Sequence, residues 1–162
     1  MNKVLVIGCP GAGKSTFSRK LAQKTGLQLH YLDMLWHRPD RTTVGREEFD
    51  ENLQKILTTD QWIIDGNYLR TLKMRIEECD TVFFFDLPVE VCLAGVEARM
   101  GKPREDMPWT ETECDEEFRQ WILEFPKYQL PVIELLLESY KSDCRIIRFT
   151  SRKEADDFIN TL

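Results

Sequence analysis

A glycine-rich segment between an apolar run and a helix-forming run constrains this chain more than any other feature. Residues 8 to 15 read Gly-Cys-Pro-Gly-Ala-Gly-Lys-Ser, which matches the pattern G-x-x-x-x-G-K-[ST]. Val4 to Ile7 precede it as a continuous apolar run, which is typical of a strand buried on both faces. Phe17 and Leu21 follow it at helical spacing. A strand, a glycine-rich turn and a helix in this order predict a phosphate-binding loop.

The residue types of this loop suit the phosphates of a nucleotide. Glycines let backbone N–H groups converge on phosphate oxygens, and the helix that begins at Lys14 adds its positive dipole end. We expect Lys14 to contact the outer phosphates of ATP and the Ser15 hydroxyl to ligate Mg²⁺. The predicted ATP-binding residues are Gly8, Cys9, Pro10, Gly11, Ala12, Gly13, Lys14, Ser15 and Thr16.

Length, charge and cysteine usage narrow the class of protein. A chain of 162 residues fits one domain. Lys and Arg number 22 against 28 Asp and Glu, and the resulting net charge of −6 argues against direct DNA binding. The 5 cysteines lack C-x-x-C spacing, which predicts reduced thiols, and no apolar run approaches the roughly 18 residues of a membrane span. We therefore expect a single cytoplasmic domain, away from membranes, that is a monomer or a homodimer.

Apolar runs alternate with segments of helical periodicity along the chain. A long helical region to about residue 140 contains Pro126 and Pro131, which we expect to interrupt it, and Ser151 with Glu154 predicts a capping box before a closing helix. Strands that alternate with helices, and that are apolar enough to be covered on both faces, predict a parallel three-layer α/β sheet. The predicted strands are residues 4 to 7, 29 to 32, 62 to 64, 81 to 85 and 146 to 149.

Several segments together resemble one known group of proteins. They are residues 8 to 15, Leu32-Asp33 with Trp36, residues 62 to 68 (Trp-Ile-Ile-Asp-Gly-Asn-Tyr) and residues 84 to 88 (Phe-Phe-Asp-Leu-Pro). Over most of the chain, this pattern is similar to the adenylate-kinase-related family of DNA topology modulation proteins. The resemblance implies a P-loop NTPase fold of the nucleoside-monophosphate-kinase type, with strand order 2-3-1-4-5.

The resemblance also implies residues for the metal and the acceptor. Asp65-Gly66 is similar to the start of the D-G-F-P-R segment of adenylate kinases, in which the aspartate holds the Mg²⁺ shell and the arginine grips the acceptor phosphate. Asp65 matches directly, although it could instead belong to a turn at the strand end. The arginine does not match, because Arg70 lies one residue later than the pattern requires. Arg70 and Arg75 are both candidates for contacting an acceptor, and the alternative for each is a solvated helix face.

Asp33, at the end of the second predicted strand, bears on the kind of acceptor. An alcohol must lose a proton on attack, whereas a phosphate oxygen is already ionised, so a carboxylate here suits an alcohol. Nucleoside kinases and shikimate-type kinases have an acid in a similar place. The alternative is that Asp33 caps the following turn. Trp36 and Tyr68 are candidates for stacking on a flat acceptor ring, with core packing as the alternative for each.

Residues 100 to 112 interrupt the helical periodicity and lie where the family carries its lid. The resemblance makes Arg99, Lys102 and Arg104 the cations that close over the phosphates, stabilise charge in the transition state and exclude water. The family's lid helix usually bears a further arginine, and Gly95 occupies that position here, which counts against full kinase activity. The alternative is an ordinary exposed loop.

Two classes of function remain from these observations. The first is an ATP- and Mg²⁺-dependent kinase that transfers the γ-phosphoryl group to a small acceptor, with a nucleoside or nucleotide favoured and a metabolite alcohol of the shikimate or gluconate type as the close variant. The second is a nucleotide-binding regulator of DNA topology without turnover, as the family's name suggests. The negative net charge argues against direct DNA binding, and the acids at the strand ends favour chemistry.

Overall fold

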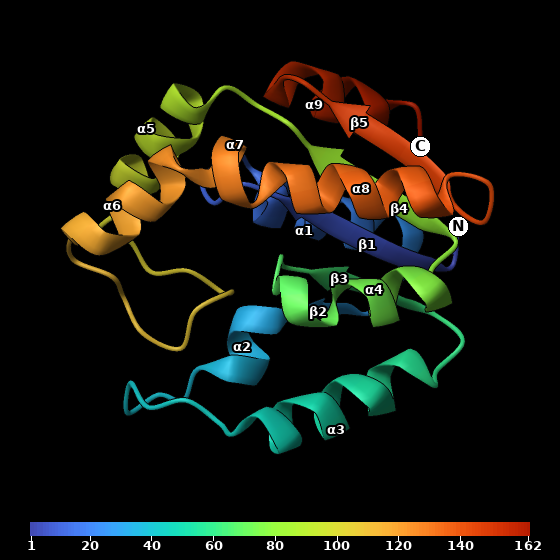
Figure 1. Ribbon diagram of the computed structural model, residues 1–162, viewed down its shortest axis with the longest axis horizontal. Helices are drawn as coiled ribbons and strands as arrows, with labels where there is room; N and C mark the ends of the chain where they lie inside the picture. Colours follow the sequence, from blue (N-terminus) through green and yellow to red (C-terminus); the bar gives the residue numbers. More distant parts are fainter.

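A five-stranded parallel sheet forms the centre of the molecule, in the order β2-β3-β1-β4-β5 (Figure 1). The structure is a computed structural model that describes residues 1 to 162. It confirms the predicted parallel α/β fold and the strand order that the family resemblance implied. The strands are β1 (Lys3–Gly8), β2 (Leu29–Tyr31), β3 (Trp62–Asp65), β4 (Thr81–Phe85) and β5 (Arg145–Phe149).

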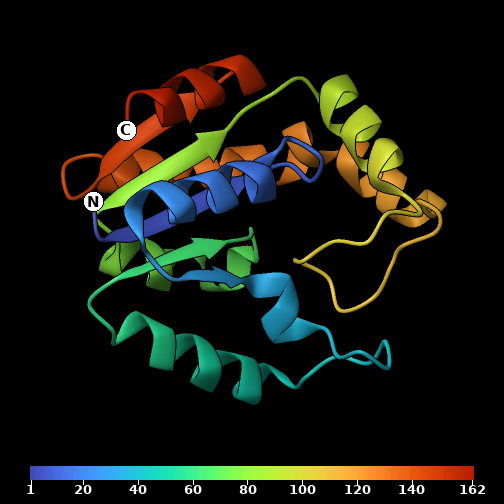
Figure 2. The same ribbon diagram turned by 180° about the vertical axis from the view of Figure 1, so that it is seen from behind.

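Helices cover both faces of the sheet. Helices α4 and α8 lie in front of it in Figure 1, and α1 and α9 cover the opposite face, as Figure 2 shows from behind. No helix combines the length and the apolar character that crossing a membrane requires. The helices are α1 (Lys14–Thr25), α2 (Leu32–Trp36), α3 (Arg46–Leu57), α4 (Leu69–Glu78), α5 (Val89–Arg99), α6 (Glu116–Leu123), α7 (Phe125–Tyr128), α8 (Leu130–Tyr140) and α9 (Arg152–Asn160).

An aromatic cluster fixes α1 against the sheet. The ring of Phe17 meets Phe83 of β4 at a centroid distance of 4.8 Å, and Phe85 and Phe149 at 5.4 Å each, all in edge-to-face geometry. Such pairs add to the hydrophobic gain of burying the rings. Because Phe17 lies in the first turn of α1, this packing holds the N-terminus of the helix at the carboxyl end of β1.

Two elements differ from the sequence prediction. Strand β2 ends at Tyr31, and Leu32 already begins α2, so Asp33 lies in the first turn of a short helix rather than at a strand end. The long helical region is divided into α6, α7 and α8, with Pro126 and Pro131 each in the first turn of a new helix, where a missing N–H is tolerated. The predicted cap is present, since Ser151 Oγ accepts from the Glu154 N–H at 3.2 Å.

Helix α5 contacts the glycine-rich loop backbone to backbone. A Cβ atom at Gly95 would lie 2.2 Å from the carbonyl oxygen of Gly11, and a Cβ atom at Gly11 would lie 2.0 Å from the carbonyl oxygen of Cys92. Neither position has room for a side chain. This close packing gives a structural reason for a glycine at position 95, and its correspondence to the family's lid arginine stays a prediction.

Replacing Gly95 should consequently disturb the loop. We expect Gly95→Ala to lower the free energy of unfolding by about 1 to 3 kcal/mol, because the added methyl group overpacks a backbone contact. Gly45→Ala is the matched control, since a Cβ atom there meets open space. Its effect should stay within about 0.5 kcal/mol. Urea denaturation of the two variants measures the difference, and equal stabilities would contradict the close-packing explanation.

Candidate active site

A cavity of about 810 Å³, here called the central cavity, opens at the carboxyl ends of the strands. The glycine-rich loop, α2, the loop between β3 and α4, the connection between α5 and α6, and α6 itself all contribute to its wall. Ligands of open α/β sheets bind at this edge. The predicted site residues that line the cavity are Pro10, Lys14, Ser15, Asp33, Asp65, Gly66, Tyr68, Arg99 and Arg104.

The glycine-rich loop adopts a conformation that only glycine takes readily. Gly11 and Gly13 have φ angles of 81° and 104°, in the left-handed region. Lys14 folds back over the loop, and its Nζ donates to the carbonyl oxygen of Cys9 at 3.0 Å. Such a loop before a helix N-terminus can hold phosphate oxygens. Of the other predicted loop residues, Cys9 and Ala12 are buried and Thr16 is exposed.

Two contacts that the sequence did not reveal hold the loop from outside. The Asn67 side chain binds both backbone groups of Gly8, accepting from its N–H at 2.9 Å and donating to its carbonyl oxygen at 2.6 Å. Arg152, at the start of α9, donates through Nη2 to the carbonyl oxygen of Gly11 at 2.8 Å. The position of Asn67 two residues after β3 was the available signal, because β3 neighbours β1 in the sheet.

Asp65 is a buried carboxylate with an unused oxygen. Its side chain is 5% exposed, and its Oδ2 atom has no hydrogen-bond partner. Burial raises the pKa of Asp65 to about 6, with Lys14 acting in the opposite direction and the nearby carboxylates Asp106 and Asp33 adding to the rise. An unpaired buried carboxylate oxygen next to Ser15 fits a hard cation such as Mg²⁺. No group of three or more His, Cys, Asp or Glu side chains could hold a metal ion, so water in the free protein, or nucleotide oxygens in a complex, would have to complete the coordination.

Asp33 is oriented by Tyr68. The Tyr68 hydroxyl donates to Asp33 Oδ1 at 2.6 Å, and the same carboxylate, together with burial, raises the pKa of that hydroxyl. Tyr68 has φ 38° and ψ 67°, a left-handed conformation that is uncommon for a bulky residue and is often found at functional sites. The pairing leaves Asp33 Oδ2 free, on a residue that lines the central cavity.

Arg75 is not an acceptor residue, contrary to the sequence prediction. It is fully buried on α4, and its guanidinium donates to the carbonyl oxygens of Gly66 at 2.9 Å and Tyr68 at 3.1 Å, as well as to that of Asn67. It is not a solvated helix residue either. Arg75 instead holds the loop between β3 and α4 from behind, which supports the strained backbone at Tyr68.

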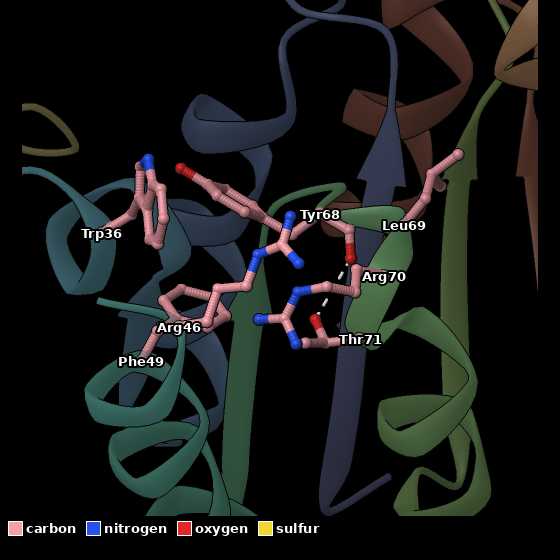
Figure 3. A pocket seen from close by; sticks show the side chains of 7 residues that line it. All are labelled: Trp36, Arg46, Phe49, Tyr68, Leu69, Arg70 and Thr71. Atoms are coloured by element: carbon pink, nitrogen blue, oxygen red, sulfur yellow. Dashed lines mark hydrogen bonds between the residues drawn. The ribbon is translucent and has the colours of Figure 1, made fainter. Parts of the chain in front are cut away.

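Arg70 and Trp36 line a second, smaller hollow of about 300 Å³ rather than the central cavity (Figure 3). Arg70 makes a two-pronged ion pair with Asp50, with N···O distances of 3.0 and 2.7 Å. The rings of Trp36 and Phe49 pack edge to face with their centroids 5.7 Å apart, and the rings of Tyr68 and Phe49 are stacked with their centroids 5.3 Å apart. The stacking predicted for an acceptor ring is thus taken up by packing within the protein, and only the Tyr68 hydroxyl bonds to a side chain of the central cavity.

The segment from 100 to 112 belongs to the loop that joins α5 to α6 (Figure 1). Its residues Arg104, Asp106, Met107 and 109 to 112 line the central cavity. Its base is closed by a hydrogen bond of 2.6 Å from the Gly101 N–H to the carbonyl oxygen of Glu111. Arg104 pairs with Glu111 at 3.1 Å and with Asp106 at 3.4 Å. Arg99 Nε and Arg104 Nη1 are buried without a partner, which leaves two cationic donors in the cavity wall.

Asp106 links this segment to the glycine-rich loop. The Ser15 hydroxyl donates to Asp106 Oδ2 at 3.0 Å, and the Asp106 side chain is almost completely buried. Asp106 has no signal in the sequence, because nothing in the local pattern of the segment distinguishes it from its acidic neighbour Glu105. The structure thus places Asp106 beside Ser15 and near Asp65.

Comparison with known proteins supports the fold. No protein-family model matches the sequence, and no curated protein matches it, so membership of the DNA topology modulation family stays a prediction. Among solved structures, the chain is similar to shikimate kinase from Acinetobacter baumannii in complex with shikimate, with a TM-score of 0.66 and 17% sequence identity. The match covers 99% of this chain and 90% of that chain. At this identity the likeness shows the fold alone, a five-stranded parallel sheet of order 2-3-1-4-5 covered by helices on both faces.

The raised pKa of Asp65 predicts how stability depends on pH. The pKa of Asp65 is 3.8 in the unfolded chain and about 6 in the folded chain, so between these pH values only the folded chain keeps the proton. The free energy of unfolding should therefore fall as pH rises from 3.8 to about 6. The fall attributable to Asp65 should total about 3 kcal/mol and be complete above pH 6. Urea denaturation in EDTA, from pH 4 to 8, should show that Asp65→Asn removes this fall and is the more stable protein at pH 8. An equal fall in both proteins would contradict the assignment.

Proposed function

We propose that the chain is an ATP- and Mg²⁺-dependent kinase that transfers the γ-phosphoryl group to a hydroxyl group of a small molecule. One observation carries the proposal: a phosphate-binding loop and an oriented carboxylate, Asp33, line the same cavity. A phosphate loop alone indicates a nucleotide ligand. The carboxylate adds a group that can accept a proton from an attacking hydroxyl.

In this proposal the loop and two arginines hold the triphosphate. Backbone N–H groups of Gly11, Gly13 and residues 14 to 16, with the Lys14 ammonium, contact the phosphates, while the unpartnered nitrogens of Arg99 and Arg104 face the charge that develops on the transferred group. Ser15 and Asp65 hold Mg²⁺, which when bound neutralises phosphate charge. Residues 100 to 112 act as a lid that keeps water from the transferred group.

Asp33 acts on the acceptor. Tyr68 binds one of its oxygens, so the other is free to take a hydrogen bond from the acceptor hydroxyl. As the acceptor's hydroxyl oxygen forms its bond to the γ-phosphorus, the hydroxyl proton passes to Asp33. The bond between the γ-phosphorus and the β-phosphate oxygen breaks, and ADP leaves. Holding the carboxylate in one orientation reduces the reorganisation needed during transfer.

The two predicted acceptor arginines do not support an acceptor with a phosphate group. Arg75 is bound to backbone carbonyls and Arg70 to Asp50, outside the central cavity. A phosphate-bearing acceptor would have to use Arg41, which lines the central cavity, whereas an uncharged nucleoside or alcohol needs no such cation. The cavity volume of about 810 Å³ accommodates either kind of molecule. The similar solved structure is a complex with shikimate, which is itself an alcohol.

Asp33→Asn tests the role of the carboxylate. With an alcohol acceptor, the substitution should lower kcat roughly a hundredfold while ATP affinity stays within about twofold, because only proton acceptance and orientation are lost. The measurement is steady-state ADP release, combined with calorimetry of ATP binding. Asp60→Asn, an exposed carboxylate away from the cavity, is the matched control and should behave as the wild type. Unchanged kcat and KM in a folded Asp33→Asn protein would remove Asp33 from the site.

A further inference from the structure

The contact between Ser15 and Asp106 joins the loop that holds phosphates to the segment that covers them. The two oxygens are 3.0 Å apart, and Asp106 is 7% exposed although it lies in an irregular loop. Burying a carboxylate costs free energy unless an opposite charge compensates it. The only ion pair of Asp106 is with Arg104, and Arg104 also pairs with Glu111. One positive charge therefore compensates two carboxylates.

Asp65, at the same place, has a buried oxygen atom that no group of the protein satisfies. Asp65 is more than nine-tenths buried and lines the cavity with Ser15 and Asp106, yet its Oδ2 atom has no hydrogen-bond partner and the residue has no ion pair. Buried polar atoms in proteins are nearly always satisfied. Two buried carboxylates near one serine hydroxyl therefore form a group of oxygen atoms that a small cation would satisfy.

The spacing of the oxygens fits Mg²⁺. Neighbouring ligands of an octahedral ion with bond lengths near 2.0 to 2.1 Å lie about 2.9 Å apart. The Ser15 and Asp106 oxygens are separated by almost this distance. The pair can therefore occupy one edge of a magnesium octahedron with little movement.

We propose that Asp106 is a ligand of the divalent cation, together with Ser15 and Asp65, so that metal binding and lid closure are one event. The proposal rests on the proposed function for the phosphate oxygens that complete the coordination. It differs from the site described above in that the lid supplies a protein ligand. Arg104 then has a further role, because its contact with Asp106 brings a cationic donor toward the phosphates whenever the metal is in place.

Mn²⁺ binding to the whole chain tests this assignment without any acceptor. Free Mn²⁺ is measured by electron paramagnetic resonance, once with the protein alone and once with ADP added. Asp106→Asn should weaken Mn²⁺ binding at least tenfold in both cases, whereas Glu105→Gln, an exposed acid beside it with the same change of charge, should leave binding unchanged. Asp106→Glu keeps a carboxylate and should retain most of the affinity. Melting curves confirm that each variant folds.

Two further readouts report on the lid. In wild type, Mg²⁺ should slow hydrogen exchange across residues 100 to 112, and this slowing should be absent in Asp106→Asn. Mn²⁺ should also broaden the NMR signals of residues 105 to 107 as strongly as those of 14 to 16, a test that needs no variant.

Unchanged or tighter Mn²⁺ binding in Asp106→Asn, faster lid exchange with metal, or sharp lid signals would each overturn the proposal. The result with Mn²⁺ alone is independent of ATP binding and phosphoryl transfer. Mn²⁺ binding that depends on Asp106 in a protein without phosphoryl transfer would therefore refute the proposed function and leave the metal site in place.

Discussion

The close contact between the glycine-rich loop and its surroundings is the constraint on which the site depends. Gly11 touches the backbone of α5, Asn67 binds both backbone groups of Gly8, and Arg152 binds the carbonyl oxygen of Gly11. These contacts come from elements that follow β3, β4 and β5, so the loop keeps its shape only when the whole sheet is assembled. A loop held in this way can present its N–H groups to phosphates without reorganising.

The electrostatics of the central cavity follow from the same assembly. The sheet edge and the proposed lid bring Asp33, Asp65 and Asp106 close to Lys14 and Ser15, and burial makes their negative charge expensive. In the proposed function, a cation and a positively charged arginine of residues 100 to 112 would relieve that cost when a nucleotide binds. The proposed arrangement would thus couple metal binding, lid closure and exclusion of water.

Local pattern predicted the phosphate loop, the strands and the closing capping box, because each depends on residues near in sequence. It failed where the outcome depends on distant partners. The spacing of α4 could not show that Arg75 turns inward to backbone carbonyls, nor that Asp50 engages Arg70. Asp106 was invisible for the same reason, since its partner Ser15 is 91 residues away. The close packing of Gly95 against a loop far along the chain likewise leaves no local signal.

Phosphorus NMR of the reaction mixture shows directly whether the protein transfers a phosphoryl group from ATP to a hydroxyl group. The protein is incubated with ATP and Mg²⁺ in the presence of nucleosides, nucleoside monophosphates, and sugar or shikimate-like alcohols. The account predicts ADP together with a new phosphomonoester signal from a hydroxyl-bearing acceptor, and the loss of both signals in Lys14→Ala. A diphosphate formed only from a nucleoside monophosphate, or inorganic phosphate as the sole product with every acceptor, would contradict it.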